Sequence, residues 1–103
     1  MNICLLGASG SIGKQTLDVI NKNPNDFTLV AFSVGKRTRC ISNILNKHNK
    51  VTDVYLLDKK KAKYYQNKFP NVRFYSDDIT KVITNSDNEI VANALVGFVG
   101  LIP

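Results

Sequence analysis

Short apolar runs alternate along this chain with segments in which apolar residues recur at helical spacing. Residues 3–6 form a continuous apolar run before a glycine, a pattern typical of a buried parallel strand. A helix is predicted to start at Ser11, because the residues after it repeat with a helical period. Its apolar stripe consists of Ile12, Thr16, Leu17, Val19 and Ile20.

The same alternation predicts the remaining elements. We expect strands at residues 27–34, 54–57, 72–75 and 90–96, and helices whose inner faces carry Ile41, Ile44, Leu45 and His48, then Ala62, Tyr65 and Phe69, then Ile79, Val82 and Ile83. Pro24 and Pro70 end the first and third helices, since the residue before proline disfavours helical dihedrals. Ser76 is the expected N-cap of the last helix, with Asp77 and Asp78 in its first turn.

Strands that alternate with helices require crossover connections, and crossovers produce a parallel sheet with helices on both faces. The pattern therefore predicts an α/β fold with a doubly wound sheet. The 103 residues suit one domain. Because the chain ends at Pro103 where another element would begin, we expect the sheet to be incomplete and the chain to be a fragment of a longer protein.

Composition indicates a soluble globular protein, with 44% hydrophobic and 21% charged residues. No apolar run approaches the roughly 20 residues that cross a bilayer. The residues after Met1 lack the features of a secretory signal, so we expect a cytoplasmic protein that starts there and has no membrane partner. Cys4 lies in a predicted strand and Cys40 near a helix start, without metal-ligand spacing, which indicates structural thiols.

The net charge of +6 raises the question of a nucleic-acid partner. The lysines are spread along the chain, and the one cluster, residues 59–61, lies in a predicted helix whose other face is apolar. A solvated helix face accounts for that cluster. The abundance of Asn, Lys and Ile further indicates a compositional bias, so we expect no nucleic-acid partner.

The segment Gly7-Ala8-Ser9-Gly10-Ser11-Ile12-Gly13 lies between the first predicted strand and helix, where a dinucleotide-binding loop belongs. Gly7 allows a tight exit from the strand, Gly10 leaves room for a pyrophosphate, and Gly13 allows close packing of helix on sheet. Amides around Ser11 and Ile12 would bind phosphate oxygens, with the hydroxyls of Ser9 and Ser11 as further donors. The loop predicts a Rossmann-like domain, although its spacing is G-x-x-G-x-x-G.

A P-loop does not fit the same segment. That motif needs a glycine five positions before its Gly-Lys pair, and Ala8 stands there. It also needs Ser or Thr directly after the lysine to hold magnesium, and Gln15 follows Lys14. The sequence therefore excludes an NTPase of this class.

The end of the second predicted strand indicates which dinucleotide would bind. An enzyme that uses NAD commonly places a carboxylate there for the ribose hydroxyls, about 20 residues after the glycines. This chain has Gly35, Lys36 and Arg37 instead, followed by a further arginine at position 39. Cations pair with a 2′-phosphate, so the sequence predicts NADPH rather than NADH. The prediction requires Gly10 and Lys36 to reach one bound molecule.

No catalytic constellation and no metal site are recognisable in the sequence. His48, the single histidine, belongs to a helix stripe. The acidic residues do not form a metal-ligand pattern: Asp53, Asp58, Asp77, Asp78, Asp87 and Glu89. We assign no catalytic residue and no metal ligand within this chain.

With these motifs placed, the chain resembles the 1-deoxy-D-xylulose 5-phosphate reductoisomerase family over essentially all of its length. The resemblance rests on residues 5–13, 15–20, Asn23-Pro24, Phe27, Val34-Gly35-Lys36 and 96–103. It implies NADPH contacts at Ser9, Gly10, Ser11 and Ile12 around the pyrophosphate and at Gly35, Lys36 and Arg37 near the 2′-phosphate. Ala8-Ser9 replaces the family's usual Ser-Thr pair, Arg37 replaces its usual asparagine, and Phe98-Val99 replaces smaller residues.

The resemblance also implies an activity for the whole enzyme. Members of the family are oxidoreductases of non-mevalonate isoprenoid biosynthesis that convert 1-deoxy-D-xylulose 5-phosphate, a sugar phosphate, to 2-C-methyl-D-erythritol 4-phosphate. They use NADPH and a divalent metal, Mg or Mn, and act as homodimers. Their catalytic and metal-binding segments would lie beyond Pro103, so this chain would supply only the cofactor site.

Two other interpretations remain open at this point. The chain could belong to another NADP-dependent reductase with a G-x-x-G-x-x-G loop, such as an extended short-chain dehydrogenase or a semialdehyde dehydrogenase. It could also be a nucleotide-sensing module without catalysis.

Overall fold

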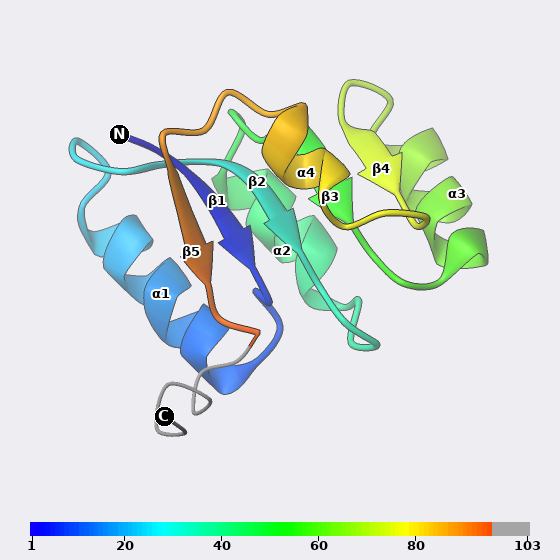
Figure 1. The fold of residues 1–103 in the computed structure, drawn as a ribbon, viewed down its shortest axis with the longest axis horizontal. Helices are drawn as coiled ribbons and strands as arrows, with labels where there is room; N and C mark the ends of the chain where they lie inside the picture. Colours follow the sequence, from blue (N-terminus) through cyan, green and yellow to red (C-terminus); the bar gives the residue numbers. More distant parts are fainter. Residues whose placement is uncertain (96–103) are drawn as a thin grey trace.

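The computed structural model describes residues 1–95, which form a five-stranded parallel sheet with helices on both faces (Figure 1). In chain order the elements are β1 (Asn2–Leu6), α1 (Ser11–Lys22), β2 (Thr28–Ser33), α2 (Cys40–Lys47), β3 (Asp53–Tyr55), α3 (Lys59–Lys68), β4 (Arg73–Tyr75), α4 (Lys81–Thr84) and β5 (Ile90–Asn93). Every paired strand is parallel to its neighbour. The α/β prediction is confirmed.

The strand order β4-β3-β2-β1-β5 explains how the helices are distributed. From β1 to β4 each strand is added on the same side of its predecessor. Right-handed crossovers therefore place α1, α2 and α3 on one face of the sheet. The chain then returns to the far side of β1 to form β5, and this reversed crossover places α4 on the opposite face. The sheet is therefore doubly wound, as predicted.

Alternate residues of β1 contact the two helical layers, which creates two cores. Ile3 and Leu5 pack in the larger core with α1, α2 and α3, where Phe32 and Ile41 are completely buried. On the other face of the sheet, a smaller core packs against α4. Its buried members are Cys4, Leu6, Ala31 and Val82.

Several predicted strands extend further than the observed ones, and one predicted apolar stripe contains residues that are exposed. Residues 54–57 were predicted as a strand, yet β3 ends at Tyr55, and Leu57 is 58% exposed. In α1 only Ile20 and Gly13 are buried, while Ile12 and Val19 are 43% and 51% exposed. The prediction for residues 90–96 is confirmed as far as Asn93 and is wrong for residues 94 and 95, and its last residue lies outside the described part of the chain.

The predicted start of the last helix was wrong. Of its expected inner stripe, Val82 and Ile83 lie in the helix and Ile79 lies before it, although all three pack in the smaller core. The helix begins at Lys81, so Ser76 is not its N-cap and the two aspartates precede it. Asp78 Oδ1 accepts hydrogen bonds from the amide and the hydroxyl of Thr80, at 2.9 and 2.7 Å. These bonds close a turn over residues 78–80 directly before the helix, which therefore begins later than predicted.

A buried carboxylate joins β3 to β4. Asp53 is completely buried and accepts from Arg73 through two parallel bonds, Nε to Oδ1 at 2.8 Å and Nη2 to Oδ2 at 3.0 Å. The Tyr75 hydroxyl donates to Oδ1 at 2.8 Å. The hydrogen bonds to Asp53 raise the pKa of Arg73. Asp53 therefore has a structural role, because its carboxylate oxygens are bound to side chains of β4.

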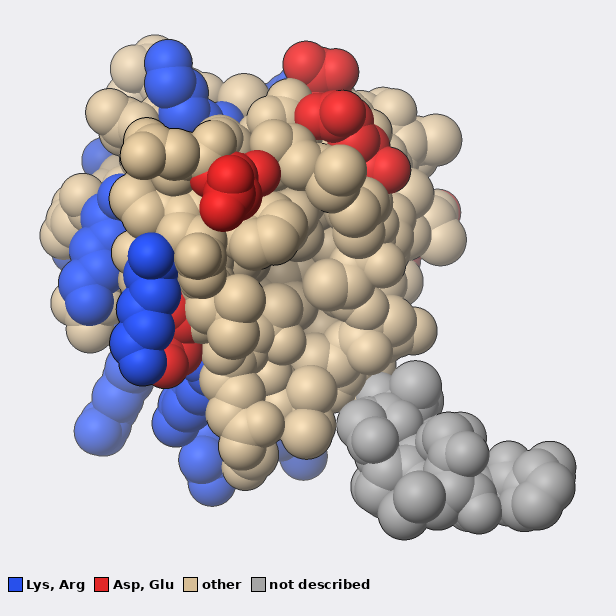
Figure 2. Space-filling model, turned by 90° about the vertical axis from the view of Figure 1, so that its left-hand side faces the viewer, with Lys and Arg blue, Asp and Glu red and all other residues tan. Residues whose placement is uncertain are grey.

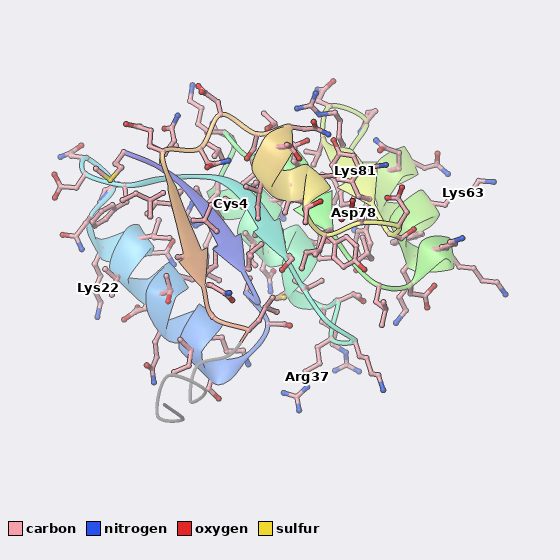
Figure 3. The ribbon with its side chains drawn as sticks, in the orientation of Figure 1. Cys4, Lys22, Arg37, Lys63, Asp78 and Lys81 are labelled. Carbon is pink, nitrogen blue, oxygen red and sulfur yellow. The ribbon has the colours of Figure 1, made fainter. Side chains whose placement is uncertain are left out.

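Both cysteines are free thiols. Cys4 is completely buried in the centre of the sheet (Figure 3). Burial, and secondarily the charge of Asp53, raise the pKa of its thiol to about 11. Burial also raises the pKa of Cys40, the first residue of α2. The prediction of a structural thiol agrees with the surroundings of Cys4, because a neutral, buried thiol is a poor nucleophile, whereas Cys40 is only partly buried.

Candidate functional site

The loops that carry the two predicted motifs lie at the same end of the sheet. In Figure 1 the strand arrows point toward the lower end, where the β1–α1 and β2–α2 loops both emerge. The crossover direction reverses between β1 and β5. In doubly wound folds the crevice outside such a switch point is where ligands bind. The topology therefore places the glycine-rich loop at the expected position for a ligand.

The first glycine is fixed by backbone geometry. Gly7 has a φ of +84°, a left-handed conformation that side-chain-bearing residues rarely adopt. Its amide donates to Ser33 Oγ at 2.9 Å, and the amide of Ala8 donates to the Ser33 carbonyl at 2.8 Å. Ser33 therefore holds the turn after β1 against the end of β2.

The third glycine is fixed by packing, whereas the space where a side chain of the second would lie is open. A Cβ at Gly13 would lie 2.7 Å from the Ala8 Cα and closer still to the Gly7 carbonyl oxygen. A Cβ at Gly10 would meet nothing nearer than 3.8 Å. The fold thus requires glycine at position 13, and the open space at Gly10 suits the close approach of a ligand.

The start of α1 offers hydrogen-bond donors toward this space. Gly10 is the N-cap of the helix and has no side chain to accept from the first amides, and no other side chain caps them. The first amides of a helix have no partner within the helix. Those of Ser11 and Ile12 therefore offer donors to an anion, aided by the helix dipole.

A hydrogen bond joins the glycine-rich loop to the β2–α2 connection, residues 34–39, which we call the basic loop. The amide of Gly35 donates to Ser9 Oγ at 3.2 Å. The hydroxyl of Ser9 accepts this bond and keeps its own proton available for donation. Gly35 directly precedes Lys36 and Arg37, so both predicted motifs border one site. The bond places the two loops side by side, which one ligand bound to both would require.

An open cleft of about 550 Å³ lies between these loops and α3. Its lining residues are Ser9, Lys14, Lys36, Arg37, Thr38, Arg39, Cys40 and Lys61. Five of these are cations and none is acidic. Among residues 1–95, none of the five forms an ion pair with a carboxylate. The cleft is therefore a concentration of uncompensated positive charge that suits an anionic ligand.

Basic side chains are visible at the lower end of the molecule, although Figure 2 faces α1 and β5 and not the cleft beside α3. Figure 3 shows Arg37 on the β2–α2 loop, pointing away from the sheet at the end where the strands finish. Figure 2 views the molecule from the left of Figure 1, and lysines and arginines gather along one side and at the lower end. The acidic residues in that view lie mostly in the upper half.

Sequence reasoning missed three cations of the cleft. From the sequence alone, Lys14 resembles a P-loop lysine, Arg39 is a neighbour of the basic pair, and Lys61 belongs to a cluster on a solvated helix face. A signal for Lys61 was available, because parallel strands end at one edge of the sheet. The first turn of a helix after β3 must therefore lie near the loop that follows β2.

The described residues contain no other obvious chemical site. No group of three or more His, Cys, Asp or Glu side chains is placed to hold a metal ion within residues 1–95. His48 caps the end of α2, and partial burial lowers its pKa. None of the helices in this part of the chain has the length and apolar character required to span a membrane.

Comparison with known proteins identifies relatives of the chain. Residues 3–103 match the sequence profile of 1-deoxy-D-xylulose 5-phosphate reductoisomerase. The enzyme of that name from Clostridium novyi is 41% identical over 108 residues, and one from Bacillus cereus is 40% identical over 103 residues. These matches cover 99% of this chain but only 28% and 27% of the relatives. The chain therefore spans less than a third of their length.

Solved structures share the fold. A reductoisomerase in complex with NADPH, fosmidomycin and magnesium aligns with a TM-score of 0.77 at 18% identity, over 88% of this chain and 23% of that chain. The enzyme from Zymomonas mobilis in complex with NADPH aligns with a TM-score of 0.61 at 21% identity, over 71% of this chain and 20% of the other. Residues 96–103, which carry the last part of the resemblance in sequence, lie outside the described structure.

Proposed function

Because the chain belongs to the 1-deoxy-D-xylulose 5-phosphate reductoisomerase family, we propose that it forms the NADPH-binding domain of such an enzyme. The hydrogen bond from the Gly35 amide to Ser9 Oγ carries this proposal. It joins a loop that suits a diphosphate to a loop that suits a further phosphate. A dinucleotide with a 2′-phosphate is a single molecule with both groups.

The residues fit this cofactor by position and by charge. Ser9, Gly10, Ser11 and Ile12 would hold the pyrophosphate through amides, a hydroxyl and the open space at Gly10. Gly35, Lys36 and Arg37 would hold the 2′-phosphate. NADPH supplies a hydride when bound. The domain's own contribution is to bind and orient it.

The whole protein would then perform the reaction of its family. We propose that it converts 1-deoxy-D-xylulose 5-phosphate to 2-C-methyl-D-erythritol 4-phosphate with NADPH and a divalent metal. We further propose that it acts as a cytoplasmic homodimer without nucleic-acid or membrane partners. Solved relatives with NADPH, fosmidomycin and magnesium support the cofactor, a small-molecule site and the metal. Residues 1–95 contain no cluster of side chains that could hold a metal ion. In this proposal the metal and the substrate therefore bind to other parts of the whole protein.

The cofactor preference provides the test. The purified protein is titrated with NADPH and with NADH, and binding is followed by the fluorescence of the reduced nicotinamide. We expect NADPH to bind at least about tenfold more tightly, since charge-assisted bonds to a phosphate contribute roughly 1.5–3 kcal/mol each. The double variant Lys36→Ala, Arg37→Ala should bring the two affinities close together and leave the melting temperature unchanged.

A matched control removes two charges elsewhere. Lys47 and Lys50 lie at the other end of α2, beside a separate hollow at the opposite edge of the sheet. The double variant Lys47→Ala, Lys50→Ala should keep the preference for NADPH. Equal affinity for the two cofactors in the unmodified protein would contradict the proposal, as would a preference that survives the loss of Lys36 and Arg37.

A further inference from the structure

Lys61 lies beside the basic loop in spite of a separation of 25 residues from Lys36. It occupies the first turn of α3, and its side chain borders the main cleft together with Lys36. A second, smaller hollow is also bordered by both lysines, along with Gly35, Leu57 and Asp58. Lys61 therefore stands between two concave surfaces that share the basic loop.

The position of Lys61 on its helix is fixed by a cap. Asp58 is the N-cap of α3, and its Oδ1 accepts from the amides of Lys60 and Lys61 at 2.9 and 3.3 Å. The carboxylate of Asp58 is thus directed at the helix start, as an N-cap requires. The cap fixes where α3 begins and, with it, the direction in which the first-turn side chains leave the helix.

A contact one turn further along fixes the side of the helix that meets the loop. The Tyr65 hydroxyl donates to the Thr38 carbonyl at 3.1 Å, and Thr38 is buried in the β2–α2 loop. The ring of Tyr65 is stacked on Phe74, with centroids 6.1 Å apart. Residues four apart lie on one face of a helix, so Lys61 shares the face of Tyr65. That face is the one that contacts the basic loop.

From this geometry we infer that Lys61 is a specificity-determining residue that binds the 2′-phosphate of the cofactor from the α3 side. The inference rests on the proposed function, because it concerns the same bound molecule. A phosphate monoester carries close to two negative charges at neutral pH. Lys36 and Arg37 would neutralise it from the loop that follows β2, and Lys61 would approach it from the neighbouring helix. The phosphate would then be enclosed on two sides.

Lys60 offers a matched control. It is also exposed, carries the same charge and belongs to the same turn of α3, but it borders neither hollow. The variants Lys61→Gln and Lys60→Gln therefore differ in position and not in net charge. Both changes are at the surface and should leave the melting temperature unchanged.

The experiment compares the dissociation constants of NADPH and NADH for each variant at low and high salt. We expect Lys61→Gln to weaken NADPH binding roughly three- to tenfold at low salt, as for a partly exposed ion pair, with no change for NADH. Lys60→Gln should change neither. Lys61→Arg, which keeps the charge, should restore NADPH binding. The loss in Lys61→Gln should shrink as salt screens the pair.

The outcomes separate this inference from the proposed function. If the unmodified protein does not prefer NADPH, the proposed function fails first. If the preference is present and depends on Lys36 and Arg37, but Lys61→Gln behaves like Lys60→Gln, only the role of Lys61 is refuted. A loss that affects NADPH and NADH equally would also refute it, because Lys61 would then contact a part common to both cofactors.

Discussion

Replacement of Gly13 by alanine tests how closely α1 approaches the turn after β1. The added Cβ would lie 2.7 Å from the Ala8 Cα and 2.8 Å from the Gly7 carbonyl carbon. Nonbonded carbons pack at about 3.5–4.0 Å, so the start of α1 must retreat by about 1 Å. The opposing atoms belong to the backbone, and no flexible side chain can move aside.

The expected cost follows from that geometry. Overpacking typically costs about 1–3 kcal/mol, and a backbone obstacle places Gly13→Ala at the upper end of this range. For a domain of this size, about 3 kcal/mol corresponds to a drop in melting temperature of at least roughly 12 °C. Gly35→Ala is the control, because a Cβ there would meet nothing within 4 Å and Gly35 has no left-handed φ.

Thermal and urea denaturation, followed by circular dichroism, measure both variants. We expect Gly13→Ala to be strongly destabilised and Gly35→Ala to stay within about 0.5 kcal/mol of the unmodified protein. If Gly13→Ala melts within a few degrees of the unmodified protein, α1 does not pack on Gly7 and Ala8 as described. The geometry of the glycine-rich loop would then be wrong.

Two further predictions concern the sheet. Arg73→Ala should lower the free energy of unfolding by about 2 kcal/mol in urea titrations, because it leaves the buried Asp53 without its cationic partner. The loss should stay below that of a fully buried pair, since the Arg73 side chain is 58% exposed. Lys22→Ala, which breaks an exposed pair, should leave that free energy nearly unchanged, and equal effects would contradict the reasoning. The pKa of Cys4 is higher in the folded state, so its stabilising effect is complete below about pH 9 and is lost as the pH rises toward 11. Over that interval the unmodified protein should lose about 2 kcal/mol more than Cys4→Ala, and parallel pH profiles would refute this.

The sequence predicts elements well where their signal is local. Glycine spacing after an apolar run predicted the turn and the helix start at Ser11, because both depend on backbone conformations that neighbouring residues determine. The start of the last helix was predicted wrongly because the local signal there is ambiguous. Asp78 bonds to Thr80 two residues later, and a sequence pattern does not show whether Asp will cap a helix or close a turn before it.

The lining of the candidate site could be predicted only in part, because the position of Lys61 in it depends on tertiary contacts. Lys36 and Arg37 follow a strand end and could be assigned from their position. Lys61 could not be separated from its neighbours by periodicity, since all three lysines of the cluster are exposed. Its placement depends on Tyr65 meeting the β2–α2 loop, a contact between segments 27 residues apart.

The position of β5 beside β1 determines when the glycine-rich loop can be completed during synthesis. β1 emerges first from the ribosome, but β5, its partner on one side, emerges last of the five strands. The amide of Ala94 donates to the Leu6 carbonyl at 2.8 Å, and backbone atoms of Ala94 and Leu95 lie against Gly7. A nascent chain that still holds these residues in the exit tunnel has an unsupported glycine turn. A ligand held by the glycine-rich loop would therefore stabilise the domain only after β5 has closed a loop of more than 80 residues onto β1.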